Sequence, residues 1–165
     1  MLVNDGRRKA RLAKGAVVLL RDQDRTRWDA EQIEAGRSAL ERALRLGGRG
    51  AYVLQAAIAV LHLDDPPDWP QLSALYGELA RRTDSPVVEL NRAAAMAQAG
   101  EAEAALALVD GLELDRYHYL HATRAELLRR LERVDEARAA YGRALELVHS
   151  DAERRFLERR LADLG

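Results

Sequence analysis

The segment from residue 135 to residue 147, DEARAAYGRALEL, decides the fold, because it combines a helix-forming composition with a marked spacing of small residues. Ala137 follows Ala125 by twelve residues, and Ala93 and Ala105 repeat that separation 32 residues earlier in the chain. Small residues are expected where two helices of an antiparallel hairpin cross closely, since a larger side chain would hold them apart. A single alanine-rich amphipathic helix is the alternative interpretation, but two pairs with one spacing favour a repeated hairpin.

The helical pattern continues outward from this segment over most of the chain. Ala, Leu, Arg and Glu dominate long stretches, and proline occurs only at Pro66, Pro67, Pro70 and Pro86. Breaks in the apolar periodicity separate eight predicted helices, over residues 29–46, 50–63, 68–82, 86–99, 101–112, 116–132, 135–149 and 151–163. The expected N-caps are Asp29, Asp68, Ser85 and Ser150, with Pro86 at a first helical position.

Short helices joined by short turns predict an all-α fold in which antiparallel hairpins stack as a right-handed solenoid similar to tetratricopeptide repeats. Residues 1–28 are predicted to form an irregular lead-in, which contains a short apolar run and a polar stretch that ends at Trp28. Residues 29–165 are predicted to form a single helical-repeat domain.

Composition excludes several classes of function. The chain has 165 residues and no cysteine, so disulfides, thiolate zinc sites and cysteine nucleophiles are excluded. A formal net charge of −1 argues against direct DNA binding. No stretch approaches the roughly 18 apolar residues of a membrane-spanning helix, and no apolar core of a secretory signal is present. We therefore expect a cytoplasmic protein without a membrane partner.

Candidate chemical groups are few. His118 and His121 are three residues apart on a predicted helix and could share a metal, but no third ligand is near in sequence, and a packed groove is the favoured interpretation. Asp22, Asp24 and Asp29 lack the glycine and glutamate of a calcium loop, which favours ion pairs with neighbouring arginines over a metal. Glycine-rich phosphate loops and catalytic motifs are absent. We expect no enzyme activity, no metal and no cofactor.

Five strings, in this order, resemble the C-terminal extension found in one group of bacterial extracytoplasmic-function (ECF) sigma factors, the group linked to YCII-related proteins. The resemblance spans residues 5–164. The strings are LLRDQDRTRWD at 19–29, AYVLQAAIA at 51–59, SPVVELNRA at 85–93, YHYLHATRAELLRR at 117–130 and ERRFL at 153–157.

This resemblance implies a tetratricopeptide-like domain that supports or controls transcription initiation. The implied partners are the N-terminal sigma domains of a longer protein, core RNA polymerase and a small YCII-related protein. The start of the chain is expected to lie inside such a longer protein. The predicted interaction residues are Asp22, Asp24, Arg25, Trp28, Asp29, Tyr52, Gln55, Asn91, Arg92, His118, His121 and Arg124.

Two other hypotheses remain open at this point. One is a free-standing tetratricopeptide adaptor that binds a peptide in its concave groove, where Asn91 and Arg92 would lie on the first helix of a repeat. For Asn91, a structural bond to a neighbouring turn is an equally good interpretation. The other is an enzyme in which His118 and His121 act as acid, base or metal ligands.

Overall fold

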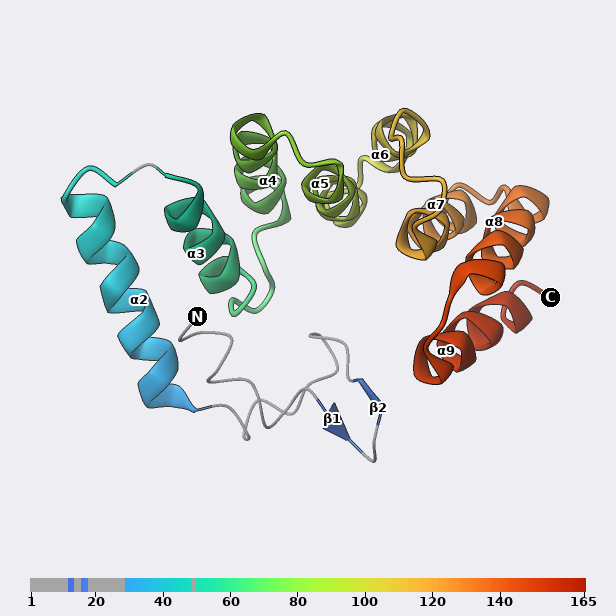
Figure 1. Cartoon of the computed structure of the whole chain (residues 1–165), viewed down its shortest axis with the longest axis horizontal. Helices are drawn as coiled ribbons and strands as arrows, with labels where there is room; N and C mark the ends of the chain where they lie inside the picture. The colour runs from blue at the N-terminus through green and yellow to red at the C-terminus, as the bar shows by residue number, and fades with distance from the viewer. Residues whose placement is uncertain (1–11, 14–15, 18–28, 49) are drawn as a thin grey trace. The chain divides into compact units, whose positions relative to one another are not determined.

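A computed structural model describes residues 12–13, 16–17, 29–48 and 50–165 (Figure 1). The chain forms two compact units, Met1–Asp68 and Trp69–Gly165, because most contacts lie within one unit or the other. Each unit is described by itself. The predicted boundary between residues 28 and 29 stays a prediction. The predicted residues Asp22, Asp24, Arg25 and Trp28 lie outside the described residues.

Eight α-helices occur in the described residues, as the sequence predicts. The first unit contains β1 (Leu12–Ala13), β2 (Ala16–Val17), α2 (Ala30–Arg45) and α3 (Ala51–Leu61). The second contains α4 (Trp69–Thr83), α5 (Pro86–Gln98), α6 (Ala102–Asp110), α7 (His118–Arg130), α8 (Val134–Leu147) and α9 (Asp151–Ala162). No helix in these described ranges is both long and apolar enough to cross a membrane.

The predicted boundaries agree with the helices to within a few residues, with two instructive differences. β1 and β2 pair in antiparallel fashion, so part of the predicted irregular lead-in is a short ladder. Between α6 and α7 the chain leaves the helix after Asp110 and turns, with the Tyr117 amide donating to the Leu114 carbonyl at 2.8 Å. For this reason α7 begins at His118 and not at Arg116.

In the first unit, Asp29 caps α2 as predicted, because its side chain accepts a hydrogen bond from the Gln32 amide at 3.0 Å. Arg37 of α2 donates to Asp64 at 3.2 Å, which ties α2 to the chain that follows α3. No residue of α2 is buried, and in α3 only Ile58 is. The apolar interior of the described part of this unit is therefore small.

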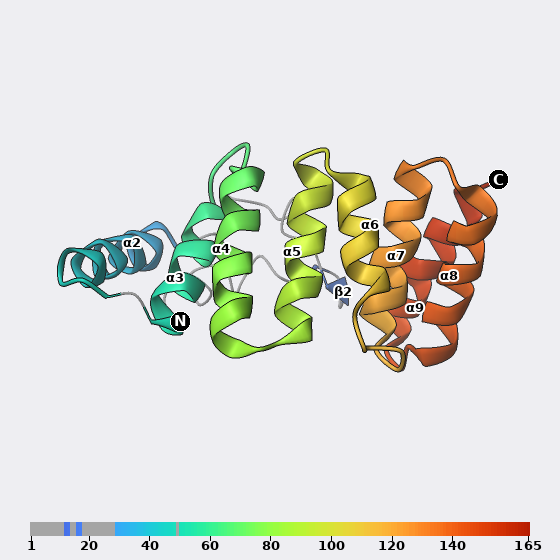
Figure 2. The same cartoon turned by 90° about the horizontal axis from the view of Figure 1, so that it is seen from above.

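In the second unit, the helices pack against their neighbours in chain order, and α5 also contacts α7 directly (Figures 1 and 2). Arg130 of α7 donates to the Ala97 carbonyl of α5 at 2.7 Å. Within this unit α5, α7 and α9 form an inner layer, and α4, α6 and α8 an outer layer. This alternation is the packing of tetratricopeptide hairpins.

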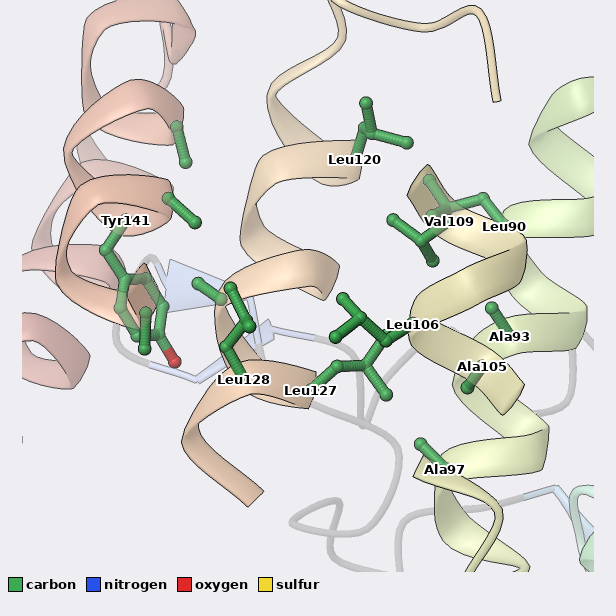
Figure 3. Close-up of a cluster of buried hydrophobic side chains, with 14 of the residues drawn as sticks. Leu90, Ala93, Ala97, Ala105, Leu106, Val109, Leu120, Leu127, Leu128 and Tyr141 are labelled. Carbon is green, nitrogen blue, oxygen red and sulfur yellow. The ribbon is translucent and has the colours of Figure 1, made fainter. Parts of the chain in front are cut away.

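The four alanines of the predicted crossing points have no exposed surface. Ala93 and Ala105 lie between α5 and α6 (Figure 3), and Ala125 and Ala137 belong to the α7–α8 hairpin. Larger buried side chains complete a continuous apolar cluster around them, among them Val109, Leu127, Leu128 and Tyr141. The small-residue prediction from the sequence is confirmed.

The helix ends confirm the capping predictions in part. Ser150 accepts from the Glu153 amide at 3.5 Å, and Pro86 occupies the first turn of α5. The prediction for Ser85 is wrong in its chemistry, because the residue sits at the N-cap of α5 but its side chain makes no capping hydrogen bond. The Val88 amide, which such a cap would serve, donates instead to the Ser85 carbonyl at 3.0 Å. The helix α4 begins directly after Asp68.

Candidate functional site

Three predicted interaction residues, His118, His121 and Arg124, lie on α7, and their side chains face different parts of the unit. His118 approaches Glu153 of α9, with 3.5 Å between Nε2 and Oε2. His121 bonds through Nε2 to the Asp115 carbonyl at 2.8 Å, so Nε2 carries the proton in that bond. Their spacing in sequence does not bring the two imidazoles to a common ligand.

A cluster of aromatic rings surrounds the contact between α7 and α9. The ring of His118 lies 4.0 Å from that of Tyr119, and Tyr117 lies 5.3 Å from Tyr119. Tyr119 donates its hydroxyl to Glu153, and this hydrogen bond is the main reason that the pKa of Tyr119 is raised to about 12. The cluster joins the first turns of the two inner-layer helices, a structural role.

A groove of about 360 Å³ opens between α6 and α8, and α7 forms its floor. His121 and Arg124 both line it. Arg124 donates through Nε to Asp110 of α6 at 2.7 Å. The remaining lining combines apolar and charged side chains: Val109, Leu112, Asp115, Leu120, Ala139, Ala140 and Arg143.

Glu126, which the sequence analysis does not single out, is the centre of a polar network. It accepts from Arg129 at 2.8 Å and 3.0 Å, from Arg130 at 3.4 Å and from the Tyr141 hydroxyl at 3.3 Å. Burial acts to raise the pKa of Glu126, but the Arg129 hydrogen bond and the nearby positive charges outweigh it and hold that pKa below its ordinary value. The spacing of Glu126, Arg129 and Arg130 is the sequence signal for this network.

The other predicted residues are distributed over both units. On α5, Asn91 is exposed, whereas Arg92 is partly buried against Gly77 of α4 and pairs with Glu89 at 3.3 Å. On α3, Tyr52 and Gln55 are exposed, and Tyr52 has 86% of its surface accessible. Asp29 is used as the cap of α2.

In the described part of the chain, no group of three or more His, Cys, Asp or Glu side chains is placed to hold an ion. His118 and His121, the one pair considered for a metal, are engaged with Glu153 and Asp115 as described above.

Comparison with known proteins relates the chain to a family, a relative and a solved structure. A model for a family of unknown function, DUF6596, matches residues 1–44. The uncharacterized protein R00370 of Rhizobium meliloti strain 1021 is 40% identical over 172 aligned residues, which cover 100% of this chain and 41% of that protein. The crystal structure of TTC0263, a thermophilic TPR protein of Thermus thermophilus, matches with a TM-score of 0.56 at 25% identity, over 82% of this chain and 72% of that one.

Among these proteins, the solved structure bears on the architecture. The chain spans about two fifths of the length of the Rhizobium relative, and the family model covers only its first 44 residues. The described fold, with its alternating layers and buried alanine crossings, matches a tetratricopeptide protein. The chain is thus an all-α, tetratricopeptide-like helical solenoid, a fold typical of protein-interaction modules without enzyme activity.

Proposed function

We propose that this chain is the C-terminal regulatory and protein-interaction domain of an ECF sigma factor. In this role it supports or controls transcription initiation by contacting the sigma core domains, RNA polymerase or a partner protein. Five sequence strings support the proposal through their resemblance to such extensions. The Rhizobium relative also supports it, because that protein is more than twice as long as the segment that this chain matches.

The observation that carries the proposal concerns α7, which contains most of the longest resembling string, residues 117–130. Packing uses its buried residues, such as Leu127 and Leu128, but leaves Tyr119 accessible and places His121 and Arg124 in a surface groove. Each of these three side chains makes a contact within the unit and still keeps accessible surface. These accessible polar groups support a contact with another protein.

The first partner to test is the N-terminal sigma region of the same gene. RNA polymerase and a small YCII-related protein are the next. We place the protein in the cytoplasm, where these partners act. The domain itself does not bind promoter DNA in this proposal, since the net charge of the chain is −1 and gives no general attraction to phosphates.

Calorimetric titration of the chain with the separately expressed N-terminal sigma region tests the proposal. We expect a dissociation constant of about 1 μM or lower, equivalent to about −8 kcal/mol. Asp24→Ala and Trp28→Ala, in the string at 19–29, are expected to weaken binding. Absence of heat with the sigma region, together with capture of an unrelated peptide, would favour the free-standing adaptor instead.

A further inference from the structure

The groove opens between α6 and α8, two helices of the outer layer (Figure 1), and α7 of the inner layer also lines it. Its floor is firm, because Val109, Leu120 and Ala140 are at most 5% exposed. A volume of about 360 Å³ is at the lower end for ligand pockets, which start at roughly 300 Å³. The groove has room for one or two side chains and not for a whole helix.

The groove contains a surplus of hydrogen-bond donors. A guanidinium has five N–H groups, and the hydrogen bond of Arg124 to Asp110 uses only Nε. Arg143 bonds through Nη1 to Glu146 at 2.6 Å, in a pair whose two side chains are about half exposed or more. Such exposed ion pairs contribute little to stability, so the arginine can leave its own carboxylate for that of a partner. Both arginines therefore have N–H groups to offer to an incoming anion.

Two carboxylates also line the groove, and they restrict which anion can enter. Asp110 is already paired with Arg124 at 2.7 Å. Asp115 belongs to the α6–α7 connection, and its carbonyl accepts from His121. A free anion would gain only the arginine contacts and would lie near these aspartates, whereas a carboxylate attached to an apolar chain would also gain apolar contact with Leu112 and Ala139.

We propose that this groove binds an acidic segment of a partner protein, in which a glutamate or aspartate stands beside an aliphatic residue. The aliphatic side chain packs on Leu112 and Ala139, the apolar lining residues that keep accessible surface. The acidic side chain binds the free N–H groups of Arg124 and Arg143, a geometry that guanidinium groups favour. This site shares His121 and Arg124 with the surface on which the proposed function rests. The peptide titration below and the calorimetric titration with the sigma region test the two proposals separately.

Titration of the ¹⁵N-labelled full chain with two acetylated and amidated hexapeptides tests the inference. One has the sequence GLEELG and the other GLQQLG, so that they differ only in charge. We expect amide shifts in α7 around His121 and Arg124 and in α8 around Arg143, with millimolar affinity for the glutamate peptide. Affinity for the glutamine peptide is expected to be at least fivefold weaker, and higher salt should reduce the difference.

Matched variants separate the groove from general charge effects. Arg143→Gln should weaken the binding of the glutamate peptide at least threefold. The double variant Arg124→Gln with Arg143→Gln should weaken it at least tenfold. Arg138→Gln is the control, because Arg138 is an exposed arginine of α8 that pairs with Asp135 and does not line the groove. It should bind like the wild type. Circular dichroism checks folding, and Arg143→Gln alone suffices if the double variant is unfolded.

Four results would overturn the inference. The first is an equal response to both peptides, which would mean apolar contact alone. The second is unchanged binding of the glutamate peptide by Arg143→Gln. The third is the absence of any shift in α7 and α8 with the glutamate peptide. The fourth is a set of shifts confined to inner-layer residues such as Asn91, which would place the acidic segment on the other side of the solenoid.

Discussion

Ala105→Leu should be strongly destabilising, whereas Ala104→Leu, one residue earlier in α6, should be nearly neutral. Ala105 has no exposed surface and faces Ala93 of α5 across the hairpin, while Ala104 is exposed (Figure 3). Leucine adds three carbons to alanine and is almost as good a helix former. The two variants therefore differ mainly in whether the added carbons lie between α5 and α6.

The magnitude follows from the absence of free space. Additional carbons in a packed interior cost about 1–3 kcal/mol, and a helix pair that must move as a unit is expected at the upper end. In a protein of this size each kcal/mol lowers Tm by about 2–4 °C. We expect Ala105→Leu to lose about 2–3 kcal/mol and Ala104→Leu to stay within about 0.5 kcal/mol of the wild type.

Urea unfolding followed by circular dichroism measures both variants, with the midpoint as the main readout and the slope as a check that the transition is unchanged. Thermal melts give an independent value. If Ala105→Leu and Ala104→Leu unfold at the same midpoint, the close crossing of α5 and α6 does not depend on a small residue. The spacing argument that predicts the hairpins would then be wrong.

Three further predictions concern side-chain contacts. Glu153→Gln should lower the pKa of Tyr119 from about 12 towards 10 in a spectrophotometric titration, while Tyr141, whose pKa is raised to about 12 mainly by burial, stays unchanged. Glu126→Gln should flatten the loss of stability on acidification: the pKa of Glu126 is lowered in the folded state, so its contribution is present above the ordinary value of 4.5 and is lost as the pH falls through the folded value. Gly142→Ala, with open space at its Cβ, should stabilise by about 0.5–1 kcal/mol in thermal unfolding, and Gly77→Ala by less, because its Cβ would lie 3.3 Å from Arg92 Nε.

The helices and their crossings could be predicted because their signals are local. Ala93 and Ala125 each lie twelve residues before the alanine that they meet on the next helix, and only a short turn joins the two helices. Helix boundaries are harder to predict where a turn competes with the helix. Residues 111–117 have helix-compatible composition but adopt a chain of turns closed by Tyr117.

The environment of each candidate side chain could not be predicted in the same way. The partner of His118 is Glu153, 35 residues further along, and the partner of Tyr119 is the same carboxylate. Such contacts depend on how α9 docks on α7, which no local pattern encodes. The network of Glu126 is only partly visible in the sequence. The spacing from Glu126 to Arg129 predicts an ion pair on the surface of one helix, but it does not predict the other contacts of Glu126.

The predicted interaction residues fall into two groups in the structure. Arg92 and His118 are partly buried and occupied by intramolecular contacts, so their substitution should alter stability before it alters binding. Asn91 and Tyr52 are exposed, and Arg124 retains unused donors in the outer groove. A substitution at Asn91, Tyr52 or Arg124 that weakens binding without lowering stability would separate recognition from folding. A substitution at Arg92 or His118 could not, because it would change both.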